Sequence, residues 1–398
     1  MSQIDHIDLG ASRTTAVHRW RFLAASLLAT LVATAVVAGP REQALRMHDR
    51  LAGVAPTDAV LAQMEAAIVA GQPLAAANIA MQASTFYSVT LKNFVAPWTN
   101  REQSVFVPLN DYTATVIGMI RDDEPFNTVL SADILYVGSG AGVPAYSATN
   151  NDHYDALEQN GADLKAVLVK QTQSAANGLP PAATAGVITS RAAAQAFFIA
   201  GTNRAMFRFT LINHMCNDLE QVQDTSRPPD RIRQDVSRSP GGDSRLFLNG
   251  CIGCHSGMDP MAQAFAYYNY DEVAGRIVYT PGQVQGKYLI NSDNFKAGYI
   301  TPDDRWDNYW RKGPNQLLGW NGATTGSGTG AKSLGQEFAS SDAFAQCQVE
   351  KVFKAVCFRA PGNAADRAQI VTMKNSLRGG GYKMKQSFAE AAVYCAGD

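Results

Sequence analysis

The feature that most constrains this chain is the pentapeptide Cys251-Ile252-Gly253-Cys254-His255. Two cysteines three positions apart at the start of a helix place both sulfur atoms on one side. This spacing is typical of c-type haem attachment, in which each thiol forms a thioether with one vinyl group of the haem and the following histidine binds the iron. We therefore expect one covalently attached haem c, held by Cys251 and Cys254, with His255 as the proximal iron ligand.

Two other interpretations of the same residues are weaker. A thioredoxin-like redox pair would need a strand–helix–strand context around the motif, and the sequence offers none. A zinc site would need a second pair of cysteines or histidines at zinc spacing, and that is missing from the sequence too.

Composition excludes several classes of protein. The 398 residues carry 34 basic and 35 acidic side chains, without the lysine and arginine runs that bind nucleic acid through its phosphates. Only one long apolar stretch is present, so a polytopic membrane protein is excluded. No Ser-His-Asp order, paired carboxylate motif or HExxH sequence supports hydrolytic chemistry.

The apolar stretch lies at the start of the chain. Basic residues, among them Arg19 and Arg21, precede the apolar segment 22–38, and Ala38 offers a small residue for cleavage. This pattern predicts that residues 1–38 are a secretory signal peptide, or, if uncleaved, a single membrane anchor. Either outcome exports the chain, so we expect a periplasmic or secreted protein, with anchoring to the inner membrane as the alternative.

Apolar periodicity predicts a mainly α fold with little strand. We expect an N-terminal helical domain at 39–200 and a c-type haem domain at 201–398 that ends in a three-helix segment. The predicted helices cover 57–69, 73–86, 111–121, 152–171, 190–199, 204–219, 341–358, 364–377 and 382–395. Short strands are predicted at 276–279 and 287–290.

Four cysteines lie outside the motif, an even number that suits disulfides in an oxidising compartment. Cys347 and Cys357 are about 15 Å apart along one predicted helix, so they cannot bond to each other. If the last three helices run up, down and up, Cys357 and Cys395 lie at the same end. This arrangement predicts Cys357–Cys395 and, by elimination, Cys216–Cys347, with four free buried thiols as the alternative.

The sixth iron ligand is less well specified. Met384 precedes the last helix in a position that resembles the methionine loop of small c-type cytochromes, so it is our candidate distal ligand. Its rivals are Met373, His214 and Met215, whereas Met258 follows His255 too closely to reach the other face. A five-coordinate iron is the remaining alternative, and each of these residues also fits an ordinary place in the core.

Arginines precede the motif in a loop rich in proline and glycine. One or two of them are candidates to pair with the haem propionates, whereas a solvated loop face is the better explanation for most of them. They are Arg227, Arg231, Arg233, Arg238 and Arg245.

The segment 249–271, NGCIGCHSGMDPMAQAFAYYNYD, resembles the haem-bearing domain found in planctomycetes and many proteobacteria, whose pattern is close to CxxCHxxxDPxGxAxExFD. Segments 121–135 and 340–367 are similar to the domains of unknown function that flank that haem domain. The resemblance implies an exported, mostly helical cytochrome with a single c-type haem, and it implies no particular reaction. The chain departs from the pattern at 262–264, where the family has a glycine.

Three functions agree with these features. The first is an electron carrier that passes single electrons between a redox partner protein in the cell envelope and an acceptor. The second is a haem enzyme with an open sixth iron position, either peroxidase-like or oxidising a small organic substrate. The third is a binding protein in which haem is a structural or sensing element. Methionine as the sixth ligand raises the reduction potential and favours electron transfer, whereas an open position admits peroxide or oxygen.

Overall fold

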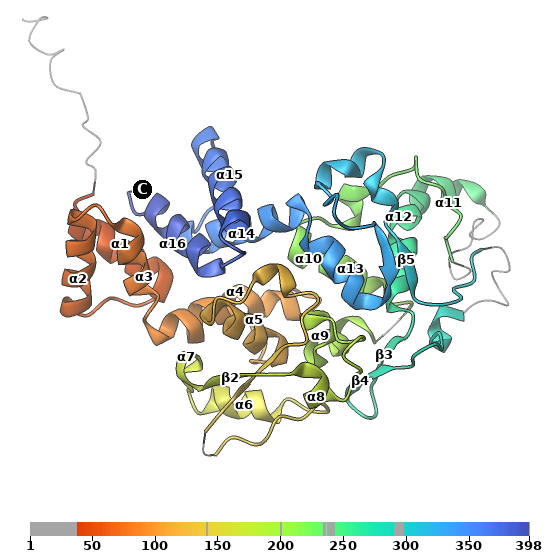
Figure 1. The fold of residues 1–398 in the computed structure, drawn as a ribbon, viewed down its shortest axis with the longest axis horizontal. Coiled ribbons are helices and arrows are strands. Elements are labelled where there is room, and N and C mark those ends of the chain that lie inside the picture. Colours follow the sequence, from red (N-terminus) through yellow and green to blue (C-terminus); the bar gives the residue numbers. More distant parts are fainter. Residues whose placement is uncertain are drawn as a thin grey trace, which may run out of the picture.

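The computed structural model describes residues 38–140, 142–199, 201–233, 236, 243–289 and 298–397. Helices dominate this part of the chain, and its strands form three antiparallel pairs, so the predicted mainly α fold is confirmed (Figure 1). The predicted leader, residues 1–38, lies outside the described residues except for Ala38. Within the described ranges, no helix has the length and apolar character needed to cross a membrane.

The described part of the chain begins with three helices that pack against one another. Helix α2 begins where the sequence predicts it, because the Thr57 side chain accepts a hydrogen bond from the Val60 backbone N–H. The predicted helix 73–86 ends early, at Ala80, and a six-residue π-helix follows after a turn. The elements of this segment are α1 (Pro40–Ala52), α2 (Asp58–Val69), α3 (Pro73–Ala80), η1 (Phe86–Leu91), α4 (Lys92–Val95) and η2 (Ala96–Thr99).

Helix α5 (Asp111–Arg121) is buried along most of its length and packs against an antiparallel pair of strands, β1 and β2. The predicted helix 152–171 is wrong as a single element. It ends at Gln159 because Gly161 takes a left-handed conformation (φ 59°) and the Ala162 N–H closes the helix on Leu157 O. The rest of that segment becomes one helical turn and the strand β2. The elements are η3 (Phe126–Thr128), β1 (Leu135–Gly138), α6 (Asp152–Gln159), α7 (Leu164–Val167), β2 (Leu168–Gln171), α8 (Gln173–Asn177), η4 (Gly186–Thr189) and α9 (Arg191–Phe197).

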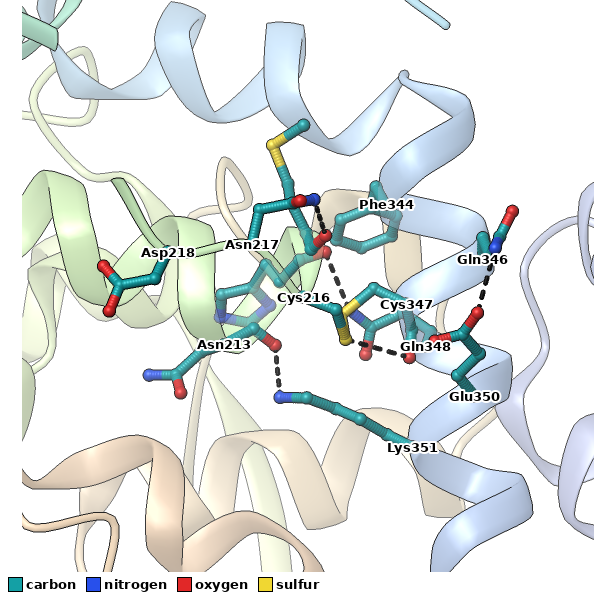
Figure 2. Close-up of a disulfide and its surroundings, with 12 residues drawn as sticks. Asn213, Cys216, Asn217, Asp218, Phe344, Gln346, Cys347, Gln348, Glu350 and Lys351 are labelled. Carbon is teal, nitrogen blue, oxygen red and sulfur yellow. Dashed lines mark hydrogen bonds between the residues drawn. A yellow bond between two sulfur atoms is a disulfide. The ribbon is translucent and has the colours of Figure 1, made fainter. Parts of the chain in front are cut away.

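Helix α10 (Arg204–Met215) is shorter than the predicted 204–219. It ends because Cys216 adopts a left-handed conformation (φ 53°) and forms a disulfide with Cys347 of α14. Figure 2 shows this disulfide above the Lys351 amine, which donates to the Asn213 carbonyl of α10. A covalent bond and a partly buried hydrogen bond therefore join α10 to the C-terminal helices.

The segment that carries the motif consists of short helices and two strand pairs. The predicted strand 276–279 is confirmed as β4, whereas the predicted strand 287–290 is wrong: it falls in a short 3₁₀ turn, η8, and residue 290 lies outside the described residues. The elements are η5 (Leu219–Val222), α11 (Ser244–Gly250), α12 (Ile252–Ala262), η7 (Gln263–Phe265), β3 (Tyr268–Asp271), β4 (Arg276–Tyr279), η8 (Gly286–Leu289), β5 (Arg305–Asp307), η9 (Tyr309–Arg311), η10 (Pro314–Leu318), β6 (Ser327–Thr329) and α13 (Gly330–Ala339).

Three helices end the chain as predicted: α14 (Asp342–Cys357), α15 (Ala364–Gly379) and α16 (Met384–Cys395). The disulfide Cys357–Cys395 joins the C-terminal ends of α14 and α16, so both predicted pairings agree with the structure. Helix α16 also packs against α1 and α3 from the start of the chain, and one hydrophobic core includes residues from both sides of the expected domain boundary at 200/201. The division into two domains stays a prediction.

Candidate haem site

The motif lies at the start of α12, with Cys251 at the N-cap position. Both thiols are partly exposed and neither forms a disulfide, although the other four cysteines of the chain are paired. The Cys254 thiol donates weakly to Leu219 O of η5 (3.6 Å). The motif therefore keeps two accessible thiols at the spacing that haem attachment needs.

The loop before the motif binds to the first turn of α12. The Asp224 backbone N–H donates to Gly253 O (2.9 Å), and the Ser256 hydroxyl donates to Asp224 O (2.8 Å). Asp224 is buried, and its carboxylate pairs with Arg227. These contacts fix the backbone on either side of Cys254 and His255.

The His255 ring is oriented by a carboxylate one helical turn further along α12. Its Nδ1 lies 3.1 Å from Oδ2 of Asp259, which is almost wholly buried. Because Nδ1 is engaged by Asp259, Nε2 is the nitrogen that can bind iron. A second hydrogen bond of this kind sets the tautomer of a ligating histidine and raises its basicity.

Two guanidinium groups stabilise the negative charge of the buried Asp259 carboxylate. Arg204, the first residue of α10, donates through Nε (3.0 Å) and Nη2 (3.2 Å), and the Arg233 guanidinium lies 3.7 Å away. Burial by itself would raise the pKa of Asp259, but the charges of Arg204 and Arg233, followed by His255, hold it well below its usual value. Asp259 is therefore ionised and accepts from His255.

The surroundings of the motif bear on the haem, dithiol and zinc interpretations of its cysteines. Leu246 and Leu248 of the neighbouring α11 are 57% and 55% exposed, apolar surface beside the thiols that a bound macrocycle can cover. A helix, not a strand, precedes the motif, unlike the thioredoxin arrangement. Burial and the charges of Glu220 and Asp218 raise the pKa of Cys254, the opposite of what a reactive dithiol needs. Among the described residues, no group of three or more His, Cys, Asp or Glu side chains is arranged to hold a metal ion.

The structure does not bring the candidate distal ligands to His255. Met384 is the first residue of α16, is 1% exposed, and belongs to a helix that packs on α14, α15, α3 and α1. Figure 1 shows α16 and α12 at opposite ends of the molecule. Met373 is in α15, and His214 and Met215 end α10, at the opposite end from the arginine that binds Asp259.

The arginines before the motif form ion pairs with the protein. Arg227 pairs with Asp224, Arg231 with Asp307 and Arg245 with Asp243, and Arg233 is buried beside Asp259. Arg238 lies outside the described residues. Their proposed role at haem propionates stays a prediction.

Sequence reasoning missed Asp259 and Arg204 as parts of the site. A signal for Asp259 was present, because a carboxylate four positions after a histidine on a helix shares its face. Comparison of the chain with protein-family models, with curated proteins and with solved structures finds no match.

Proposed function

We propose that this protein is an exported c-type cytochrome with a single haem, which transfers one electron at a time between a redox partner in the cell envelope and an acceptor. Cys251 and Cys254 hold the haem through thioethers, and Nε2 of His255 binds the iron. One observation supports haem attachment, which is the basis of the proposal: the two thiols that stay unpaired precede a histidine whose other ring nitrogen is held by a buried carboxylate.

The haem supplies the one-electron chemistry, and the described residues supply position and charge. Asp259 fixes the tautomer and the plane of the His255 ring, and Arg204 keeps Asp259 ionised and in place. Asp224 anchors the backbone around the motif through Gly253 and Ser256.

A haem enzyme with an open sixth position is the second candidate, and the Asp259 contact favours it. A carboxylate partner makes the proximal imidazole more basic, which stabilises the oxidised iron and lowers the reduction potential. Such an iron suits reactions with peroxide or with a small organic substrate.

The test is an optical spectrum of the full chain, exported and purified from cells that carry a haem-attachment system. The proposal expects haem that stays with the protein after denaturation, and loss of that haem in the double variant Cys251→Ala/Cys254→Ala. The matched control, Cys357→Ala/Cys395→Ala, removes two cysteines elsewhere and is expected to keep the haem. Absence of covalent haem from the wild type would overturn the proposal.

Carbon monoxide then separates the two candidates. A reduced protein whose spectrum does not change with carbon monoxide has a closed iron and is an electron carrier. If carbon monoxide shifts the spectrum and the protein turns over hydrogen peroxide, the iron has an open position and the enzyme is the better proposal.

A further inference from the structure

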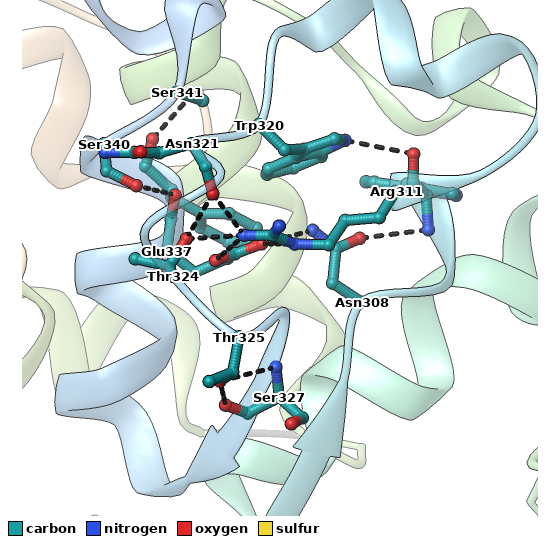
Figure 3. A network of polar contacts seen from close by, with 12 residues as sticks. Asn308, Arg311, Trp320, Asn321, Thr324, Thr325, Ser327, Glu337, Ser340 and Ser341 are labelled. Carbon is teal, nitrogen blue, oxygen red and sulfur yellow. Dashed lines mark hydrogen bonds and ion pairs between the residues drawn. The ribbon is translucent and has the colours of Figure 1, made fainter.

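A cavity of about 550 Å³ lies between the loop that precedes the motif and the β5–β6 hairpin. Arg227 and Pro228 form one wall, and Tyr309, Arg311 and Lys312 form another. This volume is within the range of small-molecule sites. Figure 3 shows the part of the wall that contains Asn308, Arg311, Thr325 and Ser327.

Charge favours an anion in this cavity. Arg227 is paired with Asp224, Arg311 with Glu337, and the one acidic lining residue, Asp307, with Arg231. Lys312 has no carboxylate partner among the described residues, so the lining residues carry one positive charge beyond these pairs. The Asp230 carboxylate, outside the lining, accepts a hydrogen bond from the Tyr309 hydroxyl (3.3 Å). The guanidinium groups of Arg227 and Arg311 are held by buried carboxylates, which keeps both cations at the cavity wall.

The wall also offers a surface for the uncharged part of a ligand. Tyr309 and Pro228 give the cavity an aromatic ring and an apolar ring. Gly326, with a left-handed backbone (φ 71°), lets the hairpin close on Arg311: a Cβ atom there would lie 2.3 Å from Arg311 Cδ. The combination of fixed cations with a ring surface suits an organic anion of small size.

Both walls of the cavity contact the helix that carries the motif. Asp224, which holds Arg227, exchanges hydrogen bonds with Gly253 and Ser256. On the other side, the Trp310 indole lies against Gly257, so closely that a Cβ atom on Gly257 would be 1.9 Å from Trp310 Nε1. The cavity is therefore packed onto α12 within a few residues of Cys254 and His255.

From this geometry we propose that the cavity binds a small organic carboxylate, with Lys312 and Arg227 as its charge partners. Binding itself does not depend on the haem.

The experiment is titration calorimetry of the full chain at low ionic strength, with benzoate as the probe and benzamide as its uncharged analogue. Wild type is expected to bind benzoate at least tenfold more tightly than benzamide, and added salt is expected to weaken benzoate binding. Lys312→Glu and Arg227→Gln are each expected to weaken benzoate binding tenfold or more. The control Lys354→Glu, an equal charge change at an exposed position of α14, is expected to leave it unchanged.

Equal affinity for the two probes, no benzoate binding by wild type, or wild-type affinity in Lys312→Glu would overturn the inference. Thermal melts of each variant show whether it is folded, and Lys312→Glu changes an exposed side chain. Benzoate binding by a protein that proves to contain no haem would support the carboxylate site and overturn the proposed function. Covalent haem without benzoate binding would support the haem attachment and overturn the carboxylate site.

Discussion

The Asp259 carboxylate lies 3.1 Å from Nδ1 of His255, one helical turn away on α12. Asp259 is at the same time bound by Arg204 from α10. The residue expected to bind iron is thus connected to a second helix through a single buried carboxylate. A change at Asp259 is expected to affect both the histidine and the packing of α10 on α12.

The first prediction concerns Asp259→Asn. The amide can still contact His255, but it makes the imidazole less basic, so we expect a higher reduction potential of the haem. Arg204 and Arg233 also lose their counter-charge, and removing one partner of a buried ion pair typically lowers the free energy of unfolding by about 3–5 kcal/mol. Potentiometric titration and denaturant unfolding measure the two effects.

A matched control separates potential from stability. Asp366 is a buried carboxylate bound by Arg359, at the start of α15 and away from the motif. Asp366→Asn is expected to destabilise the protein and leave the potential unchanged. An unchanged potential in Asp259→Asn would show that the carboxylate does not act on the iron through His255.

The second prediction compares the two disulfides. In the chain-entropy model, Cys216–Cys347, with a sequence separation of 131, stabilises the fold by about 5 kcal/mol, and Cys357–Cys395, with a separation of 38, by about 4 kcal/mol. We therefore expect Cys216→Ala/Cys347→Ala to lower the midpoint of denaturant unfolding more than Cys357→Ala/Cys395→Ala does. The reverse order would mean that local contacts outweigh loop closure.

The sequence predicted correctly those helices whose ends are marked by residues close together in the chain, such as N-cap residues. The cap at Thr57 and the cap at Ser341 both accept hydrogen bonds where the pattern places the start of a helix. The pattern was wrong at 152–171, because apolar spacing continued through Gly161 and Asp163, which end one helix and begin the next. Gly161 is a typical helix-ending residue and Asp163 a typical N-cap, so both indicated the break. The prediction followed the apolar periodicity instead.

Long-range contacts were beyond sequence reasoning. The motif itself specifies Cys251, Cys254 and His255, since their roles depend on adjacent positions in the chain. Arg204, in contrast, reaches Asp259 across a sequence separation of 55, and no local pattern indicates that pair. The cavity beside Arg227 likewise depends on residues of the β5–β6 strand pair, Asp307 and Ser327, which lie 80 and 100 positions further along the chain.

The third prediction is a pH dependence that arises from Lys287. Burial lowers the pKa of its amine from 10.5 to about 7, and the amine donates to Phe198 O and Asn269 Oδ1. Between pH 7 and 10.5 the unfolded chain holds a proton that the folded chain lacks, so stability rises with pH in this window, toward a limit of about 1.4 kcal/mol per pH unit.

The check is a series of urea unfolding curves from pH 6 to pH 10. The free energy of unfolding of wild type minus that of Lys287→Met is expected to increase as the pH rises above 7, because the variant has no proton to lose. The exposed Lys354→Met serves as the comparison and is expected to show no such increase. A flat difference for Lys287→Met would mean that the amine stays charged in the fold.

The fourth prediction concerns Glu337, the centre of the polar network in Figure 3. Its carboxylate is 1% exposed and accepts from Arg311 Nε, Arg311 Nη2 and Asn308 Nδ2, each at 2.8 Å. Burial would raise the pKa of Glu337, but the hydrogen bonds from Arg311, Thr324 and Asn308 outweigh it and lower the pKa.

Glu337→Gln leaves the Arg311 guanidinium without its counter-charge. We expect a loss of about 2 kcal/mol at pH 7, less than for a fully buried pair because Arg311 is 23% exposed. Since the pKa is lowered in the fold, the advantage of wild type is full above pH 4.5 and declines as the pH falls below it. Glu65→Gln, which breaks an exposed pair with Arg41, is the control and is expected to change stability by less than about 1 kcal/mol. A loss of similar size in both variants would contradict the role of burial.

The last prediction concerns Met384, the sequence-based candidate for the sixth iron ligand. In the structure it begins α16, buried among helices that do not include α12. Met384→Leu keeps the side-chain volume and is therefore expected to change stability by less than about 1.5 kcal/mol. It is also expected to leave the ferric spectrum, the reduced spectrum and the reduction potential as in wild type. His255→Ala, which removes the ligand beside the attached haem, provides the contrast and is expected to alter all three. If Met384→Leu instead opened the iron to carbon monoxide, α16 would have to approach α12 when haem is bound, an arrangement different from the one in Figure 1.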